Sequence, residues 1–333
     1  MVYRSKSLLL FLLLIAVVYC QGTSNVRADT REESIASSRE YVKQQLDPAR
    51  LGVGYGALMN FSAEPMLSSA TYHVAPEEGE ESVIYLHKIP IRQEFTLNGP
   101  GSTAFIEANF GYLNMEQNLK FSDSDPDKFA TSNWKAYSGT IGAGIKIPLS
   151  KGFFFEPALD GGIVYLKNDA KYYGEFANNY LKPVFKGIAF DWSTNAVLLS
   201  GMATLGYEQM WNDFQLDIKL SYSFNYINTY NESSSYQKFS TNINVTSTKI
   251  DITHPLGIAL YNLPLSWIFH AGNNTFVGPN HNALDFTYLF ELGFSLKADI
   301  SRKDWMIKSV SLGAMGITGD NVNGWSILFG YHF

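Results

Sequence analysis

Three groups of side chains in this sequence are candidates for chemistry, and the first is a pair of histidines. His87 and His254 fall on the apolar faces of two predicted strands, where some membrane phospholipases place the histidine that activates a serine nucleophile. In those enzymes a serine follows the histidine two residues later. Here both of these positions are aliphatic, Ile89 and Leu256, so the pattern does not predict a phospholipase.

The second group lies near one predicted loop and consists of His270, His281 and Asp285. Barrel proteases of the omptin kind place an aspartate and a histidine at the ends of strands in this way. No paired motif accompanies the three residues, and such proteases have fewer strands than this chain predicts. The group therefore does not predict a protease.

The third group, Asp123, Asp125 and Asp127, resembles the start of a calcium loop. Such a loop needs glycine at its sixth position and a bidentate acid at its twelfth, where this chain has Lys128 and Trp134. The sequence therefore predicts no catalytic residue, no metal site and no cofactor, and we expect a protein that is not an enzyme.

The N-terminal residues predict a signal peptide over 1–28. Two basic residues precede an apolar run from Leu8 to Val18, which has the length of a signal-peptide core and is too short to span a bilayer. Cleavage is expected after Ala28 or after Gly22.

Composition excludes several classes of protein. The one cysteine, Cys20, lies in the predicted signal peptide, so the mature chain is expected to carry no disulfide. The net charge of −6 is spread along the chain, which argues against nucleic acid as a partner. Mean hydropathy is −0.08 although 15% of the residues are aromatic, which is typical of strands that alternate apolar and polar residues.

Period-two alternation predicts an all-β fold, a 12-stranded antiparallel transmembrane β-barrel with a short N-terminal helix. In the clearest strand, 214–226, seven apolar residues alternate with six polar ones. The ranges 153–165 and 286–298 alternate in the same way. The other nine predicted strands are 51–61, 82–97, 102–115, 135–149, 190–207, 247–260, 262–271, 305–317 and 324–333.

The predicted connections alternate in length. Those after even-numbered strands are short, at 98–101, 150–152, 208–213, 261–262 and 301–304. Those after odd-numbered strands are mostly long and polar, at 62–81, 116–134, 166–189, 227–246 and 272–285, with a shorter one at 318–323. Outer-membrane barrels have short periplasmic turns and longer external loops. The alternation therefore predicts such a barrel, with both ends of the chain on the periplasmic side.

One segment predicts a helix. Residues 29–46 carry a thin apolar stripe and end before Pro48. A twelve-stranded barrel has a lumen wider than the side chains of its wall can fill. We therefore expect the region 29–48 to enter the lumen from the periplasmic side as a plug, or to lie free below the barrel, while the barrel domain covers 49–333.

The polar parity of the strands predicts which residues face the lumen. Gly52, Gly54 and Gly56 are expected on the crowded inner face of the first strand. Charged residues of both signs share this parity: Arg92, Glu107, Lys146, Glu156, Asp160, Asp217, Lys219, Glu291 and Lys297. An Arg or Lys that faces lipid at the midplane costs about 2–4 kcal/mol, so these positions are expected inside. Because both signs occur, we expect internal ion pairs and a filled or narrow lumen.

The last strand predicts a signal for insertion into the membrane. Its outward face is a ladder of apolar groups that ends at the carboxylate: Trp325, Ile327, Phe329, Tyr331 and Phe333. A strand that closes a lipid-facing barrel needs such a face. In outer-membrane barrels, a terminal aromatic of this kind resembles the signal that the insertion machinery reads.

The closing residues Gly319–Phe333 contain a Gly-Asp-Asn turn, a Gly-Trp-Ser step and the terminal ladder. Together with the signal peptide, the helix and twelve strands, they resemble the solitary outer-membrane autotransporter-like β-barrel family. The resemblance implies a non-enzymatic outer-membrane barrel of a Gram-negative bacterium, similar to an autotransporter translocator. Little chain precedes the first predicted strand, so we expect no passenger. The implied partners are outer-membrane lipid, lipopolysaccharide and the barrel assembly machinery, and we expect a monomer.

Two other functions fit the same fold. A narrow porin-like channel for small solutes would use the lumen. A surface adhesin would act through the loops at 166–189 and 227–246, which are rich in Tyr, Asn and Ser.

Overall fold

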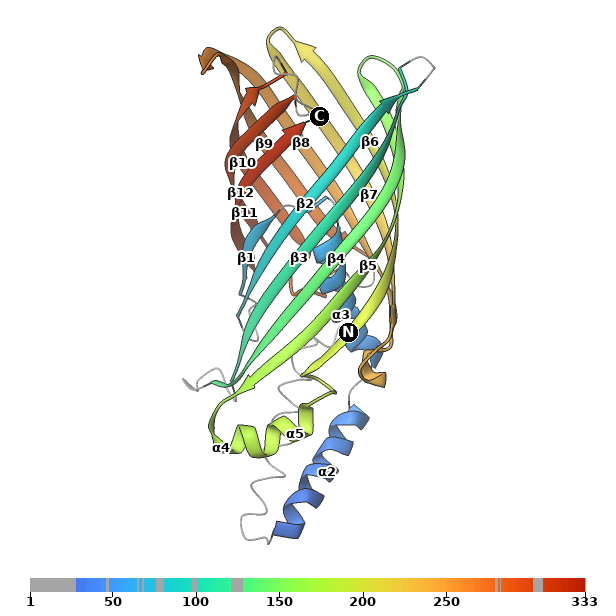
Figure 1. Ribbon diagram of the computed structural model, residues 1–333, viewed down its shortest axis with the longest axis vertical. Helices are drawn as coiled ribbons and strands as arrows, with labels where there is room; N and C mark the ends of the chain where they lie inside the picture. The colour runs from blue at the N-terminus through green and yellow to red at the C-terminus, as the bar shows by residue number, and fades with distance from the viewer. Residues whose placement is uncertain are drawn as a thin grey trace.

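The computed structural model describes residues 28–45, 48–64, 66–67, 69–75, 81–97, 101–120, 128–278, 281, 283–301 and 308–332. Twelve antiparallel strands close into one barrel, in which neighbours in sequence pair and β1 (Ala70–Val74) meets β12 (Val322–His332) (Figure 1). The barrel predicted from the sequence is therefore confirmed. The other strands are β2 (Ser82–Thr96), β3 (Thr103–Lys120), β4 (Lys128–Pro148), β5 (Phe153–Tyr172), β6 (Trp192–Trp211), β7 (Phe214–Tyr230), β8 (Ser240–Leu260), β9 (Leu263–Val277), β10 (Tyr288–Asp299) and β11 (Ser309–Gly319).

Two longer helices precede the barrel wall, α2 (Ala28–Gln45) and α3 (Pro48–Ala63). Short helices lie in two loops: α4 (Gly174–Phe176), η1 (Ala177–Leu181), α5 (Lys182–Phe185) and η2 (Ser235–Gln237). Within the described part of the chain, no helix combines the length and the apolar character needed to cross a membrane.

The prediction of a first strand at 51–61 is wrong, because these residues belong to α3. The first strand is β1, which lies in the range 62–81 that the sequence predicts as a loop. α3 is enclosed by the barrel and is apolar on most of its surface, so it lacks the polar stripe that marks a surface helix. Its glycines, which occur at every second position, produce the same alternation as a strand.

A smaller correction concerns Phe286, which the alternation places on the lipid face of the tenth strand. In the structure β10 begins at Tyr288, and Phe286 is buried in the core.

The connections define two ends of the barrel. One end, the short-turn end, carries the connections 97–102, 149–152, 212–213, 261–262 and 300–308. The other, the long-loop end, carries 75–81, 121–127, 173–191, 231–239, 278–287 and the two-residue turn 320–321. β12 runs toward the short-turn end, whereas α2 lies beyond the long-loop end (Figure 1). The prediction that both ends of the chain lie on one side is therefore wrong for the described residues.

The outward face of the wall is an apolar band. Along β5 the outward row runs from Phe153, through the exposed Leu159 and Ile163, to the half-buried Tyr165. The ion pair between Lys167 and Asp169 follows immediately. Twelve residues of strand cover about 40 Å, which at a tilt near 45° is about 28 Å of height. This matches the hydrocarbon thickness of a bilayer, about 30 Å.

Aromatic rings mark the edge of the band near the long-loop end. His87, Tyr112, Tyr137 and Tyr165 are successive register partners on β2 to β5. Their ring centroids are 6.2, 5.0 and 6.3 Å apart in that order. Rings of this kind form a girdle at the membrane–water interface in outer-membrane barrels.

A second aromatic group lies near the short-turn end. The ring of His254 lies 4.4 Å from that of Phe214 and 5.8 Å from that of Trp267, which in turn stacks on Phe294 at 5.8 Å. Both outward histidines, His87 and His254, are therefore members of aromatic rows and have ring neighbours instead of a serine partner.

β1 is too short to close the whole wall. It pairs with β2 only over Ser82–Leu86 and with β12 only over Val322–Trp325. Closer to the short-turn end, side chains bridge the gap. The hydroxyl of Ser326 donates to the carbonyl of Ser69, and the hydroxyl of Tyr331 donates to the carbonyl of Pro90.

The apolar band makes a prediction about depth. Leu159 is 74% exposed at the centre of the outward row of β5, and Tyr261 is 90% exposed at the tip of a short turn. Leu159→Arg should lower the free energy of unfolding by about 2–4 kcal/mol, whereas Tyr261→Arg should change it by about 0–1 kcal/mol. Denaturant unfolding of the barrel in lipid vesicles measures both. Equal losses from the two changes would mean that the band does not face lipid.

Candidate functional site

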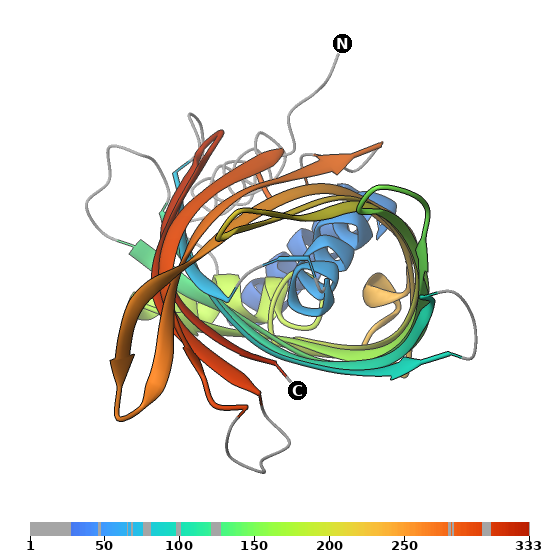
Figure 2. The same ribbon diagram turned by 90° about the horizontal axis from the view of Figure 1, so that it is seen from above.

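The candidate site is the lumen, in which α3 lies (Figure 2), in the half toward the long-loop end (Figure 1). α3 passes so close to the start of β8 that two of its positions must be glycine. A Cβ at Gly52 would lie 2.5 Å from the Cβ of Phe239, and one at Gly56 would lie 2.2 Å from Cγ2 of Thr241. Since β8 starts at the long-loop end, α3 enters the lumen from that end and not from the short-turn end.

Gly54 lies on a different face of α3 from these two glycines. Nothing lies within 4 Å of a Cβ built at this position. Gly52 and Gly56, spaced by four residues, share one helix face against the wall, as small residues do wherever helices approach closely. The alternation in the sequence predicts a strand for all three glycines and therefore does not reveal the contact with β8.

Aromatic rings from the wall hold the sides of α3. The ring centroid of Tyr55 lies 5.2 Å from Trp134 and 4.5 Å from Trp192. Deeper in the lumen, Phe61 contacts Tyr72 at 5.1 Å and Phe286 at 5.8 Å. Offset and edge-on aromatic pairs of this kind contribute about 0.5–1.5 kcal/mol each beyond the burial of their area. They make the long-loop half of the lumen an apolar core.

Glu64 fixes the point at which the chain leaves α3 and turns back toward β1. Its carboxylate is 1% exposed and accepts hydrogen bonds from the Ser223 hydroxyl and the Asn225 amide of β7, both at 2.8 Å. The ammonium of Lys88 on β2 donates to the Glu64 carbonyl. A buried carboxylate is tolerated only when such donors surround it, so the turn is tied to two opposite parts of the wall.

The short-turn half of the lumen is polar and carries ion pairs. Arg92 on β2 donates two hydrogen bonds to Glu156 on β5, at 2.8 and 2.9 Å. Lys146 on β4 reaches Glu208 on β6 at 2.6 Å. Because these strands are not neighbours, the contacts run through the interior of the barrel. Paired, bidentate contacts are the strong form of such an interaction.

The other predicted lumen charges are also covered from solvent to different extents. Asp160 and Glu291 are buried, whereas Glu107, Asp217, Lys219 and Lys297 are half-buried. Lys219 pairs with Asp217 at 3.6 Å, and Glu107 lies beside Asp160. The lumen therefore contains both an ion pair of opposite charges, Lys219 with Asp217, and a pair of neighbouring carboxyl groups, Glu107 with Asp160.

α2 lies outside the lumen, against the loop between β5 and β6 (Figure 1). The guanidinium of Arg39 donates to the carbonyls of Pro183, Val184 and Lys186, at 2.9, 3.1 and 2.8 Å. These carbonyls end α5 and have no partners within their own helix, so a cation stabilises them. The prediction that 29–48 plugs the lumen or lies free on the periplasmic side is therefore corrected: α3 fills the lumen and α2 docks at the long-loop end.

Apolar contacts reinforce this docking. Val42 of α2 is buried in a cluster with Leu181, Val184 and Phe185, and Ile35 and Tyr41 pack against the same cluster from the side. The thin apolar stripe seen in the sequence is thus the face that contacts the loop helices.

The predicted loop group at His270, His281 and Asp285 does not form. His281 is exposed, and its Nδ1 lies 2.9 Å from the carbonyl of Gly278 in its own loop. His270 lies inside β9 and contacts Asp251 on β8 and Ser295 on β10. Sequence reasoning missed this contact because it depends on the register of three strands.

Asp123, Asp125 and Asp127 lie outside the described residues. Among the residues that are described, no group of three or more His, Cys, Asp or Glu side chains has the arrangement of a metal site.

The C-terminal ladder faces outward along β12. Trp325, Ile327 and Phe329 are exposed, and Tyr331 is half-buried where its hydroxyl meets Pro90. Phe333 lies outside the described residues.

Comparison with known proteins gives one family. The model of the solitary outer membrane autotransporter beta-barrel domain matches residues 81–333. No curated protein matches the chain.

Three solved structures share the fold. The translocator domain of the autotransporter NalP from Neisseria meningitidis has a TM-score of 0.51 at 12% identity, over 90% of this chain and 98% of that chain. The transport unit of the autotransporter AIDA-I from Escherichia coli has 0.52 at 9%, over 86% and 100%. The beta domain of the Bordetella autotransporter Brka has 0.50 at 11%, over 79% and 96%. At these identities the likeness shows the fold.

The close contact of α3 predicts how its seat can be loosened. Gly56→Leu should push the helix away from Thr241 and open a water path, which raises single-channel conductance in planar bilayers. Gly54→Ala is the matched control, because its methyl group meets open space. It should leave conductance unchanged and stabilise the helix by about 0.5–1 kcal/mol. Unchanged conductance in Gly56→Leu would mean that α3 does not seal the lumen.

Proposed function

Because this chain belongs to the solitary outer membrane autotransporter β-barrel domain family, we propose that it is a self-threaded translocator whose own N-terminal helix is held on the cell surface. The barrel lies in the outer membrane and has the fold of autotransporter translocators. In such barrels the short turns face the periplasm and the longer loops face outward. The long-loop end of this barrel is then its external end.

The observation that carries the proposal is the direction of α3. Its start lies against β8 at the long-loop end, at Phe239, and its end lies deep in the lumen, at Ser223 of β7. A chain that runs inward from the external end must first have passed outward through the lumen, or have been held there while the wall closed around it. Either route leaves α2 outside.

The docking of α2 supports a cargo that stays attached. Arg39 and Val42 bind the loop between β5 and β6, so α2 stays docked at the external end of the barrel. In this proposal the cargo is α2 itself. Its translocation requires no enzymatic step.

No specific observation favours the porin-like channel or the surface adhesin. α3 fills half of the lumen with apolar side chains, which is unfavourable for a porin-like channel. Most of the range 227–246 belongs to β7 and β8, which leaves 231–239 for an adhesive loop.

The sidedness of α2 can be measured directly. Ser37 is an exposed residue of α2, and Ser150 is an exposed residue of a short turn. In a Cys20→Ser background, Ser37→Cys should react with a membrane-impermeant maleimide on intact cells. Ser150→Cys should react only after the outer membrane is permeabilised. The reverse pattern would place α2 in the periplasm and exclude the proposal.

The proposal also assigns a partner to the C-terminal ladder, namely the machinery that assembles outer-membrane barrels, with lipid and lipopolysaccharide around the finished wall. The support is chemical: Phe329 and its ladder neighbours are exposed apolar groups on the final strand.

Recognition by that machinery should depend on position along the chain, not only on burial in lipid. Phe329→Ser should strongly reduce the heat-modifiable barrel recovered from outer membranes. Phe290→Ser removes a comparable exposed phenylalanine from β10 and should have a much smaller effect. Equal reductions would show that the ladder contributes lipid contact and no signal.

A further inference from the structure

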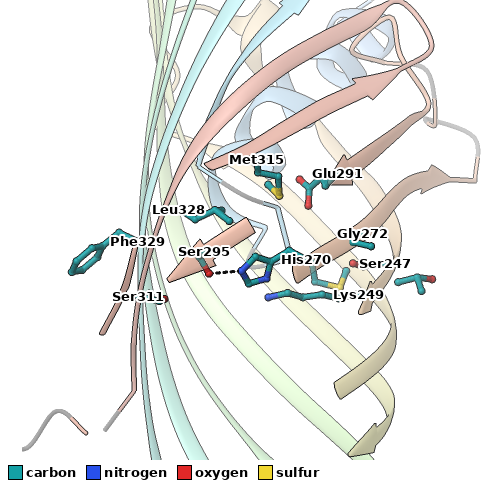
Figure 3. A pocket seen from close by; sticks show the side chains of 14 residues that line it. Ser247, Lys249, His270, Gly272, Glu291, Ser295, Ser311, Met315, Leu328 and Phe329 are labelled. Atoms are coloured by element: carbon teal, nitrogen blue, oxygen red, sulfur yellow. Dashed lines mark hydrogen bonds between the residues drawn. The ribbon is translucent and has the colours of Figure 1, made fainter. Parts of the chain in front are cut away.

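Three side chains on the inner face of neighbouring strands form a chain of hydrogen bonds. Nδ1 of His270 on β9 lies 2.7 Å from Oδ1 of Asp251 on β8. Nε2 of His270 lies 2.7 Å from Oγ of Ser295 on β10 (Figure 3). His270 is the register partner of Asp251 and of Gly293, which brings Ser295 two residues along β10 into reach of the imidazole.

The partners fix the direction of these hydrogen bonds. An ionised carboxylate only accepts, so Nδ1 of His270 carries the proton and donates it to Asp251. Nε2 is then free to accept the hydroxyl proton of Ser295. A nucleophile, a base within 2.6–3.2 Å of it and a carboxylate that orients the base are the three parts of a serine hydrolase centre.

A cavity gives this centre space for a substrate. It has a volume of about 260 Å³, and its lining includes His270, Ser295, Lys249 and Glu291 together with the apolar Met315 and Leu328 (Figure 3). It lies on the wall of the lumen, close to Met66 in the turn that follows α3. A cavity below the usual range of about 300–1,000 Å³ for ligand sites suits a small acyl group.

We propose that Asp251, His270 and Ser295 form a catalytic centre that hydrolyses small carboxylic esters in the lumen. Oγ of Ser295 attacks the ester carbonyl carbon while Nε2 of His270 takes the hydroxyl proton. The proton passes to the leaving alkoxide, which departs as an alcohol and leaves an acyl-serine. Water then attacks the acyl group, and His270 takes a proton from the water and returns it to Ser295. One ester and one water give one acid and one alcohol.

The charges of the cavity define the substrate further. Lys249, whose Nζ lies 3.4 Å from Oδ2 of Asp251, supplies the positive charge beside which an oxyanion would form. The backbone N–H groups of β8, β9 and β10 donate to the hydrogen-bond ladders between these strands, so they cannot stabilise an oxyanion. The ammonium of Lys249 takes that role. Asp251 and Glu291 outnumber Lys249, so neutral or cationic esters fit better than anionic ones.

Burial restricts access to the nucleophile. Ser295 is 1% exposed, and the side chain of His270 is 17% exposed. Only a compact acyl donor can approach such a serine, which is consistent with the volume of the cavity. The proposed activity is independent of the translocator role.

The first test uses the unmodified full-length barrel. Methanesulfonyl fluoride, a very small serine-directed reagent, should sulfonylate the folded, heat-modifiable protein at Ser295, and mass spectrometry of the digested protein identifies the labelled residue. p-Nitrophenyl acetate should be hydrolysed with an initial burst of one nitrophenolate per barrel. Labelling elsewhere, or none at saturating reagent, overturns the proposal without the need for any variant.

The second test separates catalysis from structure. Ser295→Ala should abolish labelling and hydrolysis, and His270→Gln should lower the rate about 10²–10⁴-fold, as expected for loss of a general base. Ser200→Ala removes a buried serine of β6 that does not line the cavity and should leave both signals unchanged. Each variant is compared in its heat-modifiable form only. Equal rates in His270→Gln and the unmodified protein would mean that the three residues only stabilise the wall.

Discussion

A twelve-stranded wall encloses more space than its own inward side chains can fill, and the rest of this structure depends on how that space is filled. α3 takes the long-loop half, which requires glycine at Gly52 and Gly56 and an aromatic lining on the wall. The short-turn half is occupied by charged side chains that form ion pairs, and it is less completely filled. The chain turns back at Glu64, midway through the lumen. β1 therefore starts halfway along the wall and can pair only with the long-loop halves of β2 and β12. Its five residues and the side-chain bridges beside it are consequences of that turn.

Most of the wall could be predicted from the sequence because lipid outside and polar groups inside impose period-two alternation on every long strand. β7, with its row from Phe214 onward, is the clearest case. The same logic failed for α3 and β1. A helix enclosed on all sides has no polar stripe to reveal it, and a strand of five residues is shorter than the nine to eleven that a span requires. What fills a barrel is less visible in sequence than what faces its lipid.

The candidate site was predicted in part. Arg92 and Glu156, two of the charged residues on the polar parity, are paired across the lumen. Contacts between strands are a different matter. Asp251, His270 and Ser295 occupy three strands, and their meeting depends on the register between those strands, which alternation does not define. All three residues lie on the inward parity of neighbouring strands. That shared parity is the only sign in the sequence that the three side chains could meet.

The position of α3 is the central claim, and a disulfide measures it most directly. Gly52 faces Phe239, and a Cβ at Gly52 would lie 2.5 Å from the Cβ of Phe239, close enough for a disulfide after a small shift of the helix. In a Cys20→Ser background, Gly52→Cys with Phe239→Cys should cross-link in the assembled barrel and produce a reducible change in electrophoretic mobility. Gly54→Cys with Phe239→Cys should not, because Gly54 lies on another face of α3. Absence of the first cross-link, or equal formation of both, would contradict a helix threaded from the long-loop end.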